Sequence, residues 1–378
     1  MRKIEPRGLQ MKTELAPAIS RLKKLIPKFK KIRVAVLGDL MLDRYLCGTA
    51  SRLSPEAPVS VVDFESQSDF LGGAANVAAN LAALGARVDL FGVVGGQSGA
   101  SKTRNDDPAG AAIHACLRKS GIADGNVIAD PRRITTIKTR VIARHQQIVR
   151  IDHEKRDPLL PEIEEKLFRK LVATLGKIDV LLLSDYDKGL ISDSLAERVL
   201  HACHKYEVPV FVKPKTSRLF AYRGARAVVC NAKEASTYLN RDLPDEEAIA
   251  EAGRALLAQF GCAAVIITRR EKGMSIFEET SPRYLSIPAT SFDVTYARVG
   301  QAAVDNASSG RQVFDVTGAG DTVLSVLSAA VTAGSTFADA AFLANVAAGV
   351  VVRKLGTATV SPTELVTALE EVRAAKNT

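Results

Sequence analysis

The sequence predicts an α/β protein in which helices cover both faces of a mostly parallel sheet. Two observations carry this prediction. Short apolar strands alternate with helix-like stretches in the second half: strands are expected at residues 180–183, 209–212, 227–229 and 264–268, and helices at 192–205 and 246–260. Polar residues also recur where the expected strands end: Asp39, Asp185, Lys215, Asn231 and Thr268. Since ligands bind at the carboxyl ends of parallel strands, this pattern indicates one ligand crevice.

The first half is expected to add strands at residues 33–37, 59–64 and 88–94. Residues 134–143 and 147–152 read as a hairpin. Residues 1–30 are expected to form a basic tail, with one short helix at about 18–25 that ends near Pro27 because proline does not continue a helix.

Composition excludes several classes of protein. The net charge of +9 lies in the first 33 residues, which hold eleven Lys or Arg and two acids, so the rest of the chain is neutral. With no Trp in addition, a nucleic-acid partner is not expected. No apolar run reaches the roughly 18 residues of a membrane span, so no membrane partner is expected either. The five scattered cysteines fit a reducing, cytoplasmic location.

The stretch with the strongest functional signal is residues 314–322, FDVTGAGDT, which an apolar, helix-compatible run follows. Gly318 and Gly320 allow a tight turn and close approach to a ligand. Amides at a helix start suit a phosphate, and Asp321 beside them would suit proton transfer. The alternative is that Asp321 merely caps the helix, and this stretch alone does not decide between the two.

Two further stretches contain candidate binding residues. Gly72 and Gly73 precede a helix in which Asn76 offers a donor and an acceptor to a hydroxyl-rich ligand; tight packing with Asn76 as a cap is the alternative. The expected hairpin carries a group of cations: Lys138, Arg140, Arg144 and Arg150. They form either a solvated face or an anion site.

Three motifs taken together resemble the ribokinase-like (PfkB) family of carbohydrate kinases. They are GGAAN at 72–76, Asn231-x-x-Glu234, and DVTGAGD at 315–321. Within that family, residues 52–59, 146–150 and 355–360 closely resemble the D-glycero-D-manno-heptose 7-phosphate kinases. The resemblance covers roughly residues 31–370. It implies a three-layer α/β/α domain with a small β-sheet lid, formed here by about 44–68 and 132–153.

The resemblance also implies a role for each matching residue. Asp321 would be the general base, and the amides of Gly318, Ala319 and Gly320 would bind the transferred phosphoryl group. Sugar binding falls to the following residues: Asp39, Asp43, Gly72, Gly73, Asn76, Arg140, Arg144 and Arg150. The nucleotide site would contain these: Lys215, Asn231, Glu234, Thr268, Gly273 and Asn345. Glu234 would act on Mg²⁺ through water, and Asp315 and Thr317 would match a monovalent-cation (K⁺) site.

The function implied is ATP-dependent phosphorylation of the anomeric hydroxyl of heptose 7-phosphate, on the route to ADP-heptose for lipopolysaccharide. Another sugar or nucleoside kinase, or a silent sugar-binding protein, are the alternatives. A homodimer formed through the lids is expected. Because some heptose kinases carry a fused nucleotidyltransferase domain and this chain ends at Thr378, we expect the kinase step only.

The chain departs from the family pattern at three places. Lys213 stands where an Asp commonly precedes Pro-Lys. Residues 95–105 and 290–312 form insertions, and their role is not predicted.

Overall fold

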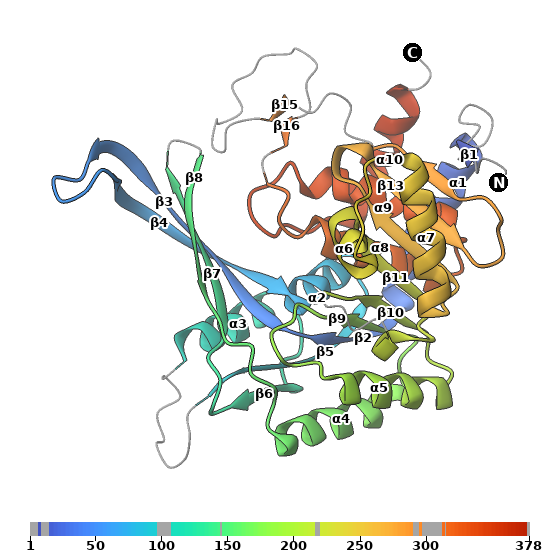
Figure 1. Ribbon diagram of the computed structural model, residues 1–378, viewed down its shortest axis with the longest axis horizontal. Helices are drawn as coiled ribbons and strands as arrows, with labels where there is room; N and C mark the ends of the chain where they lie inside the picture. The colour runs from blue at the N-terminus through green and yellow to red at the C-terminus, as the bar shows by residue number, and fades with distance from the viewer. Residues whose placement is uncertain are drawn as a thin grey trace.

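A ten-stranded sheet forms the middle layer of the computed structural model, which describes residues 7–8, 15–96, 107–143, 146–215, 220–289, 295–296, 312–313 and 315–375 (Figure 1). Across the sheet its strands are β1 (Arg7–Gly8), β14 (Leu285–Ile287), β13 (Met274–Glu278), β12 (Ala264–Thr268), β11 (Ala227–Asn231), β10 (Val210–Lys213), β9 (Val180–Ser184), β2 (Arg33–Gly38), β5 (Arg87–Gly95) and β6 (Val127–Asp130). Neighbouring strands from β12 to β6 are parallel, and β13 is antiparallel to both of its neighbours. The predicted mostly parallel sheet is confirmed.

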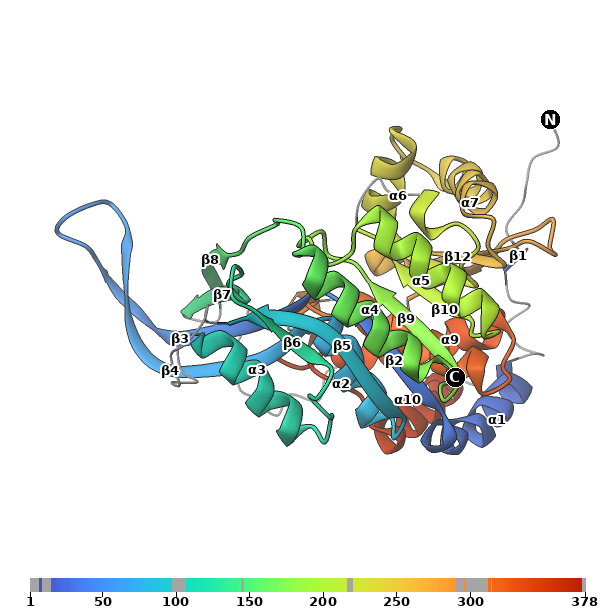
Figure 2. The same ribbon diagram turned by 90° about the horizontal axis from the view of Figure 1, so that it is seen from below.

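Helices cover both faces of the sheet (Figure 2). One face packs against α1 (Leu15–Leu25), α2 (Ala74–Ala83), α3 (Pro108–Lys119), α8 (Ala319–Thr332), α9 (Phe337–Val351) and α10 (Pro362–Ala375). The other packs against α4 (Pro161–Leu175), α5 (Asp193–Lys205), α6 (Ala232–Leu239) and α7 (Glu246–Phe260). Strand side chains alternate between these two cores: Val34 and Val36 join the first, and Ala35 and Leu37 the second. Single-turn 3₁₀ helices occur at η2 (Phe220–Tyr222) and η3 (Arg270–Lys272).

A second, four-stranded sheet projects from the domain where the lid is expected, and we refer to it as the lid (Figure 1). Its strands, in order, are β4 (Ser60–Gly73), β3 (Leu40–Leu53), β7 (Thr136–Ala143) and β8 (Gln146–His153). β3 begins immediately after Asp39, and β4 ends at Gly73, where α2 starts. The base of the lid is therefore continuous with the segments that carry the predicted sugar-binding residues.

The N-terminal segment corrects one expectation. From residue 15 it is not a tail, because α1 and the 3₁₀ helix η1 (Ile26–Lys31) pack into the core. The apolar positions recur at helical spacing, and they are buried: Leu15, Ile19, Leu22, Leu25, Ile26 and Phe29. The lysines lie on the outer side of this segment, so the net charge alone did not reveal that the helix is amphipathic.

Most of the two predicted insertions lies outside the described residues. Within the later one, β15 (Thr295–Tyr296) and β16 (Gln312–Val313) pair in parallel. Arg144 and Phe314 also lie outside the described residues. Among the helices that are described, none has the length and apolar character to cross a membrane.

Candidate active site

The glycine turn places Asp321 inside the molecule, and α8 begins at Ala319. Gly318 is the N-cap, with a φ of 82° that favours glycine. A Cβ at Gly318 would also lie 2.6 Å from Asn76 Nδ2, so a side chain there is excluded on both grounds. Asp321 is the third helical residue and only 2 % exposed. The alternative that Asp321 is the N-cap is therefore wrong.

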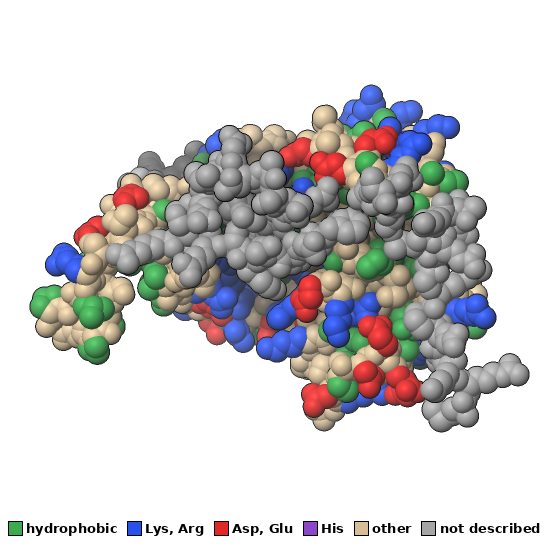
Figure 3. Space-filling view, turned by 90° about the horizontal axis from the view of Figure 1, so that it is seen from above, with side chains coloured by type: hydrophobic (Ala, Val, Ile, Leu, Met, Phe, Trp, Pro, Cys, Tyr) green, Lys and Arg blue, Asp and Glu red, His purple; other side chains and the backbone are tan. Residues whose placement is uncertain are grey.

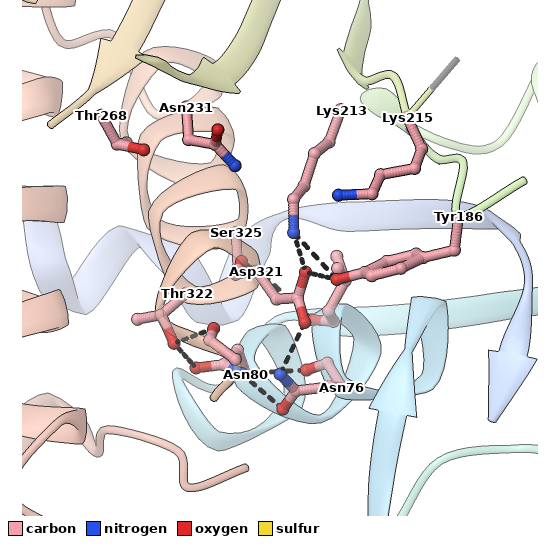
Figure 4. Close-up of polar contacts among 12 residues, drawn as sticks. Asn76, Asn80, Tyr186, Lys213, Lys215, Asn231, Thr268, Asp321, Thr322 and Ser325 are labelled. Atoms are coloured by element: carbon pink, nitrogen blue, oxygen red, sulfur yellow. Dashed lines mark hydrogen bonds and ion pairs between the residues drawn. The ribbon is translucent and has the colours of Figure 1, made fainter. Parts of the chain in front are cut away.

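Three side chains from different elements donate to the Asp321 carboxylate (Figure 4). Asn76 Nδ2 lies 2.9 Å from Oδ2, and Lys213 Nζ lies 2.6 Å from Oδ1. The Tyr186 hydroxyl donates to Oδ1 at 2.5 Å. Lys213 also donates to the Tyr186 oxygen, at 2.8 Å, so these groups form one connected network. Burial and the negative charge of Asp321 raise the pKa of Tyr186 well above its usual value, so Tyr186 remains a donor.

A buried polar layer beneath Asp321 fixes its orientation. Asn80 donates to Asn76 Oδ1 at 3.1 Å, and Thr322 donates to Asn80 at 2.9 Å. Asn76 is fully buried in α2, whose N-cap is Gly73. Asn76 is thus not a cap, and its amide is directed to Asp321.

The two aspartates at the base of the lid have different surroundings. The Asp39 carboxylate accepts from three backbone amides, those of Tyr186 at 2.8 Å and of Lys188 and Leu190 at 3.3 Å. Burial, together with nearby Asp185, raises the pKa of Asp39 to about 6. Asp39 therefore positions the loop that carries Tyr186.

Asp43, in contrast, pairs with the Arg140 guanidinium. Burial raises the pKa of Asp43, although the charge of Arg140 opposes this. Gly72 leaves the space that this carboxylate occupies, because a Cβ there would lie 2.3 Å from Asp43 Oδ2.

The lid cations share one face of the lid sheet. Two rows of side chains cross β3, β7 and β8 on this face. One row consists of Tyr45, Arg140 and Arg150, and the neighbouring row consists of Asp43, Lys138 and Asp152. Tyr45 donates to Asp315 at 2.6 Å, so this face is turned toward the start of α8. The Arg140 side chain is 8 % exposed, whereas that of Arg150 is 50 % exposed and bonded to Asp152 at 2.8 Å.

Glu154 ties the lid to the domain. It accepts from Lys188 at 2.7 Å and Arg156 at 3.1 Å, and it lies 3.4 Å from Lys138 of β7. Burial would raise its pKa, but the bonds from Lys188 and Arg156 and the nearby charge of Lys138 outweigh burial and hold the pKa at about 2. The lid base and the Tyr186 loop are thereby joined.

We expect Glu154→Gln to lower the free energy of unfolding at pH 7. A carboxyl whose pKa falls from 4.5 to about 2 on folding stabilises the fold above pH 4.5, and loses this contribution as the pH falls toward 2. The variant should therefore show a shallower loss of stability across that interval in denaturant titrations. Glu162→Gln, at an exposed position of α4, is the control. Identical pH profiles for wild type and Glu154→Gln would contradict this account.

A cavity of about 240 Å³ opens beside Lys213 and the glycine turn. Its lining includes Lys213, Lys215, Asn231, Glu234, Thr268, Gly318 and Gly320. The Asn231 side chain caps α6, and the Glu234 side chain accepts a hydrogen bond from the Asn231 backbone amide. This capping box fixes both side chains at the cavity wall. Lys215 donates to Glu234 at 2.8 Å.

Two groups of predicted residues lie outside this cavity. Asn345 and Gly273 do not line this cavity; Asn345 donates to the Pro288 carbonyl at 2.8 Å. Asp315 accepts from the Thr317 amide at 2.8 Å as well as from Tyr45. Over the described part of the chain, no group of three or more His, Cys, Asp or Glu residues could hold a metal ion.

Sequence reasoning missed Tyr186 and did not locate Lys213. Tyr186 follows β9, and Lys213 is the last residue of β10, so both lie at carboxyl ends of strands, where polar residues were expected to converge. That position was the available signal. Asn80, one helical turn after Asn76, had no distinguishing pattern.

Residues 31–364 match the model of the pfkB family carbohydrate kinases, and the chain belongs to this family. The fold resembles that of Arabidopsis thaliana ribokinase complexed with ribose and ATP (TM-score 0.65, 18% identity, 90% of this chain and 99% of that one). It also resembles Escherichia coli phosphofructokinase-2 in complex with substrates and products (TM-score 0.68, 16% identity, 90% and 100%).

Two curated relatives are more similar in sequence. Both are named bifunctional protein HldE. The one from Geotalea uraniireducens (strain Rf4) is 44% identical over 345 residues, covering 91% of this chain and 64% of the relative. The one from Geobacter sulfurreducens is 45% identical over 338 residues, covering 89% and 63%. The chain therefore spans less than two thirds of the length of these relatives.

Proposed function

We propose that this kinase uses ATP to phosphorylate the anomeric hydroxyl of D-glycero-D-manno-heptose 7-phosphate, giving the 1,7-bisphosphate that precedes ADP-heptose. One observation carries the proposal. The buried Asp321 carboxylate accepts bonds from Tyr186 and Lys213, which line the cavity, and it lies near enough to Asp43 for its charge to act on that lid carboxylate. A nucleotide on one side and an anionic sugar on the other would meet at Asp321.

The chemistry needs positioning, charge neutralisation and a base. The anomeric oxygen bonds to the γ-phosphorus while the bond from that phosphorus to the bridging oxygen breaks, and its electron pair leaves with ADP. The hydroxyl proton passes to Asp321. Among the amides of this turn, those of Ala319 and Asp321 already donate to the Val316 and Gly318 carbonyls, at 3.3 and 3.0 Å. The amides of Gly318 and Gly320 would therefore be the ones to face the transferred group.

Mg²⁺ fits this site only through water and phosphate. Glu234 is the carboxylate at the cavity wall, and both of its oxygens already accept bonds, from the Asn231 amide and from Lys215. Mg²⁺ usually keeps several waters and binds substrate phosphates, where it neutralises charge. Glu234 would hold its water shell, and Asp315 with Thr317 would be the site for K⁺.

Glu234→Gln is expected to raise the Mg²⁺ requirement more than it weakens sugar binding. Gln also serves in a capping box, so the change removes mainly the negative charge. Loss of an outer-shell partner typically costs about 10–100-fold in metal affinity. Rate measurements across a Mg²⁺ titration test this. Glu364→Gln is a matched control, because Glu364 has the same capping role at the third residue of α10. An unchanged titration would make Glu234 purely structural.

The lid supports a homodimer. Every residue of edge strand β8 is exposed, and an uncovered strand edge is a template for pairing. Large apolar side chains are exposed along the lid: Leu53, Val59, Phe64, Ile148, Val149 and Ile151. Figure 3 shows hydrophobic side chains gathered at the free end of the projecting arm. A second copy would bury this surface.

We therefore expect a dimer at micromolar concentration by light scattering, and expect Val149→Glu with Ile151→Glu to produce monomers of lower activity. Tyr206→Glu, a change of the same kind at an exposed aromatic on the body, should remain dimeric. A fully active wild-type monomer would contradict the lid-mediated dimer.

The substrate is tested with a panel of sugars and sugar phosphates, ATP and Mg²⁺, with the products identified by phosphorus NMR. A new anomeric phosphate on heptose 7-phosphate is the expected result. Faster turnover of another sugar would show that the proposed substrate is wrong but would leave the proposed type of reaction unchanged. Absence of turnover across the panel would favour a sugar-binding protein.

A further inference from the structure

Lys213 is the least expected group at this site. It ends β10, at the position where related kinases commonly carry an Asp before Pro-Lys. Its side chain is 14 % exposed, and its ammonium lies 2.6 Å from Asp321 Oδ1 and 2.8 Å from the Tyr186 oxygen. Two of the three N–H donors of an ammonium are thus directed to these groups. The exchange of Asp for Lys changes the local charge by two units.

The ammonium also lies over the glycine turn. A Cβ at Gly320 would be 3.2 Å from Lys213 Nζ and 3.4 Å from its Cε, so the lysine packs directly against the backbone that would bind the transferred phosphoryl group. Lys213 lines the same cavity as Asn231, Glu234 and Gly318. An anion held at this turn would be within reach of Nζ by a change of side-chain rotamer alone.

In the structure, the Lys213 ammonium occupies the Asp321 carboxylate that would act as the base. Oδ1 of Asp321 receives both Lys213 and Tyr186, and Oδ2 receives Asn76. A sugar hydroxyl that is to lose a proton to this carboxylate needs one oxygen with fewer donors. A phosphoryl group with two negative charges would compete for the ammonium with the singly charged Asp321 carboxylate, because both would make charge-assisted bonds and the phosphoryl group carries more charge.

We propose that Lys213 is a catalytic residue whose ammonium moves from Asp321 to the oxygens of the transferred phosphoryl group when ATP binds. This inference rests on the proposed kinase reaction and adds a residue to it. The move neutralises charge that develops on the phosphoryl oxygens as the bond to ADP breaks, and it opens Oδ1 for the proton of the attacking hydroxyl.

The test compares wild type with Lys213→Ala, Lys213→Arg and the control Lys205→Ala, an exposed lysine of α5. Removing one preorganised donor to a transition state typically costs about 10²–10³-fold in kcat. We expect this loss in Lys213→Ala, partial recovery in Lys213→Arg, and partial rescue of Lys213→Ala by added ethylammonium. Lys205→Ala should match wild type.

Binding supplies a readout independent of turnover. Calorimetry with ADP and Mg²⁺, with and without aluminium fluoride as a phosphoryl mimic, should show Lys213→Ala weakened toward the fluoride complex and nearly unchanged toward ADP. This comparison needs no sugar, so it stands even if the substrate panel overturns the proposed function. Equal weakening toward both ligands, or a kcat of Lys213→Ala within a few-fold of wild type, would overturn the role of Lys213.

Discussion

Replacing Asp321 with Asn is expected to lower kcat by at least about 10²–10⁴-fold, the usual contribution of general-base catalysis. The substitution keeps the size of the side chain and removes the proton acceptor. It also creates one donor–donor conflict. The new NH₂ group must face either Asn76 Nδ2 or the donors Lys213 and Tyr186, because Asn76 Oδ1 is already held by Asn80. An unmade buried bond costs about 1–3 kcal/mol, so stability is measured separately from rate.

Asp339→Asn provides the matched control. Asp339 is the third residue of α9, as Asp321 is of α8, but it bonds to Arg21 on the surface. Nucleotide affinity, measured by calorimetry, should be largely retained in Asp321→Asn. Near-normal turnover in a folded Asp321→Asn protein would refute the assignment of the base.

The local parts of this site could be predicted from the sequence, and the long-range parts could not. The glycine turn and the capping box depend on neighbours in the chain, so the spacing of Gly318, Asp321, Asn231 and Glu234 carried the signal. The bond between Asn76 and Asp321 joins residues 245 positions apart, and no local pattern specifies it. The sequence showed Lys213 only as a departure from the family pattern and did not indicate that it bonds to Asp321.

The prediction of a basic N-terminal tail was wrong for a different reason. The lysines of α1 and η1 dominated the composition, while its buried leucines at helical spacing carried the structural information. Net charge describes solvent-facing residues and says little about which face of a helix is apolar. Local patterning predicted the strand at residues 59–64 and the hairpin at 134–152, but β3 was assigned to the lid only by the family resemblance. The bond from Tyr45 to Asp315 joins positions 270 residues apart, and no local pattern specifies it.

The second large effect is expected when the sugar lacks its phosphate. The lid face beside Asp43 carries Lys138, Arg140 and Arg150, and a neutral sugar has no need of these cations. The transferred group arrives near Asp321, so the existing phosphate would lie farther along the lid. Its binding energy would help to orient the anomeric hydroxyl. The two arginines differ in their availability to a ligand: Arg140 is buried against Asp43, whereas Arg150 is half-exposed and bonded to Asp152.

Arg150→Ala should therefore raise KM for heptose 7-phosphate and leave the unphosphorylated heptose unaffected. Arg140→Ala should lower kcat as well, because it also releases Asp43. A charge-assisted bond contributes about 1.5–3 kcal/mol, or roughly 10–150-fold in kcat/KM. Arg44→Ala is the control, since Arg44 is on the opposite face of β3 and pairs with Asp69. If heptose were turned over as well as its 7-phosphate, or if both variants kept wild-type KM and kcat, these arginines would only keep the lid soluble.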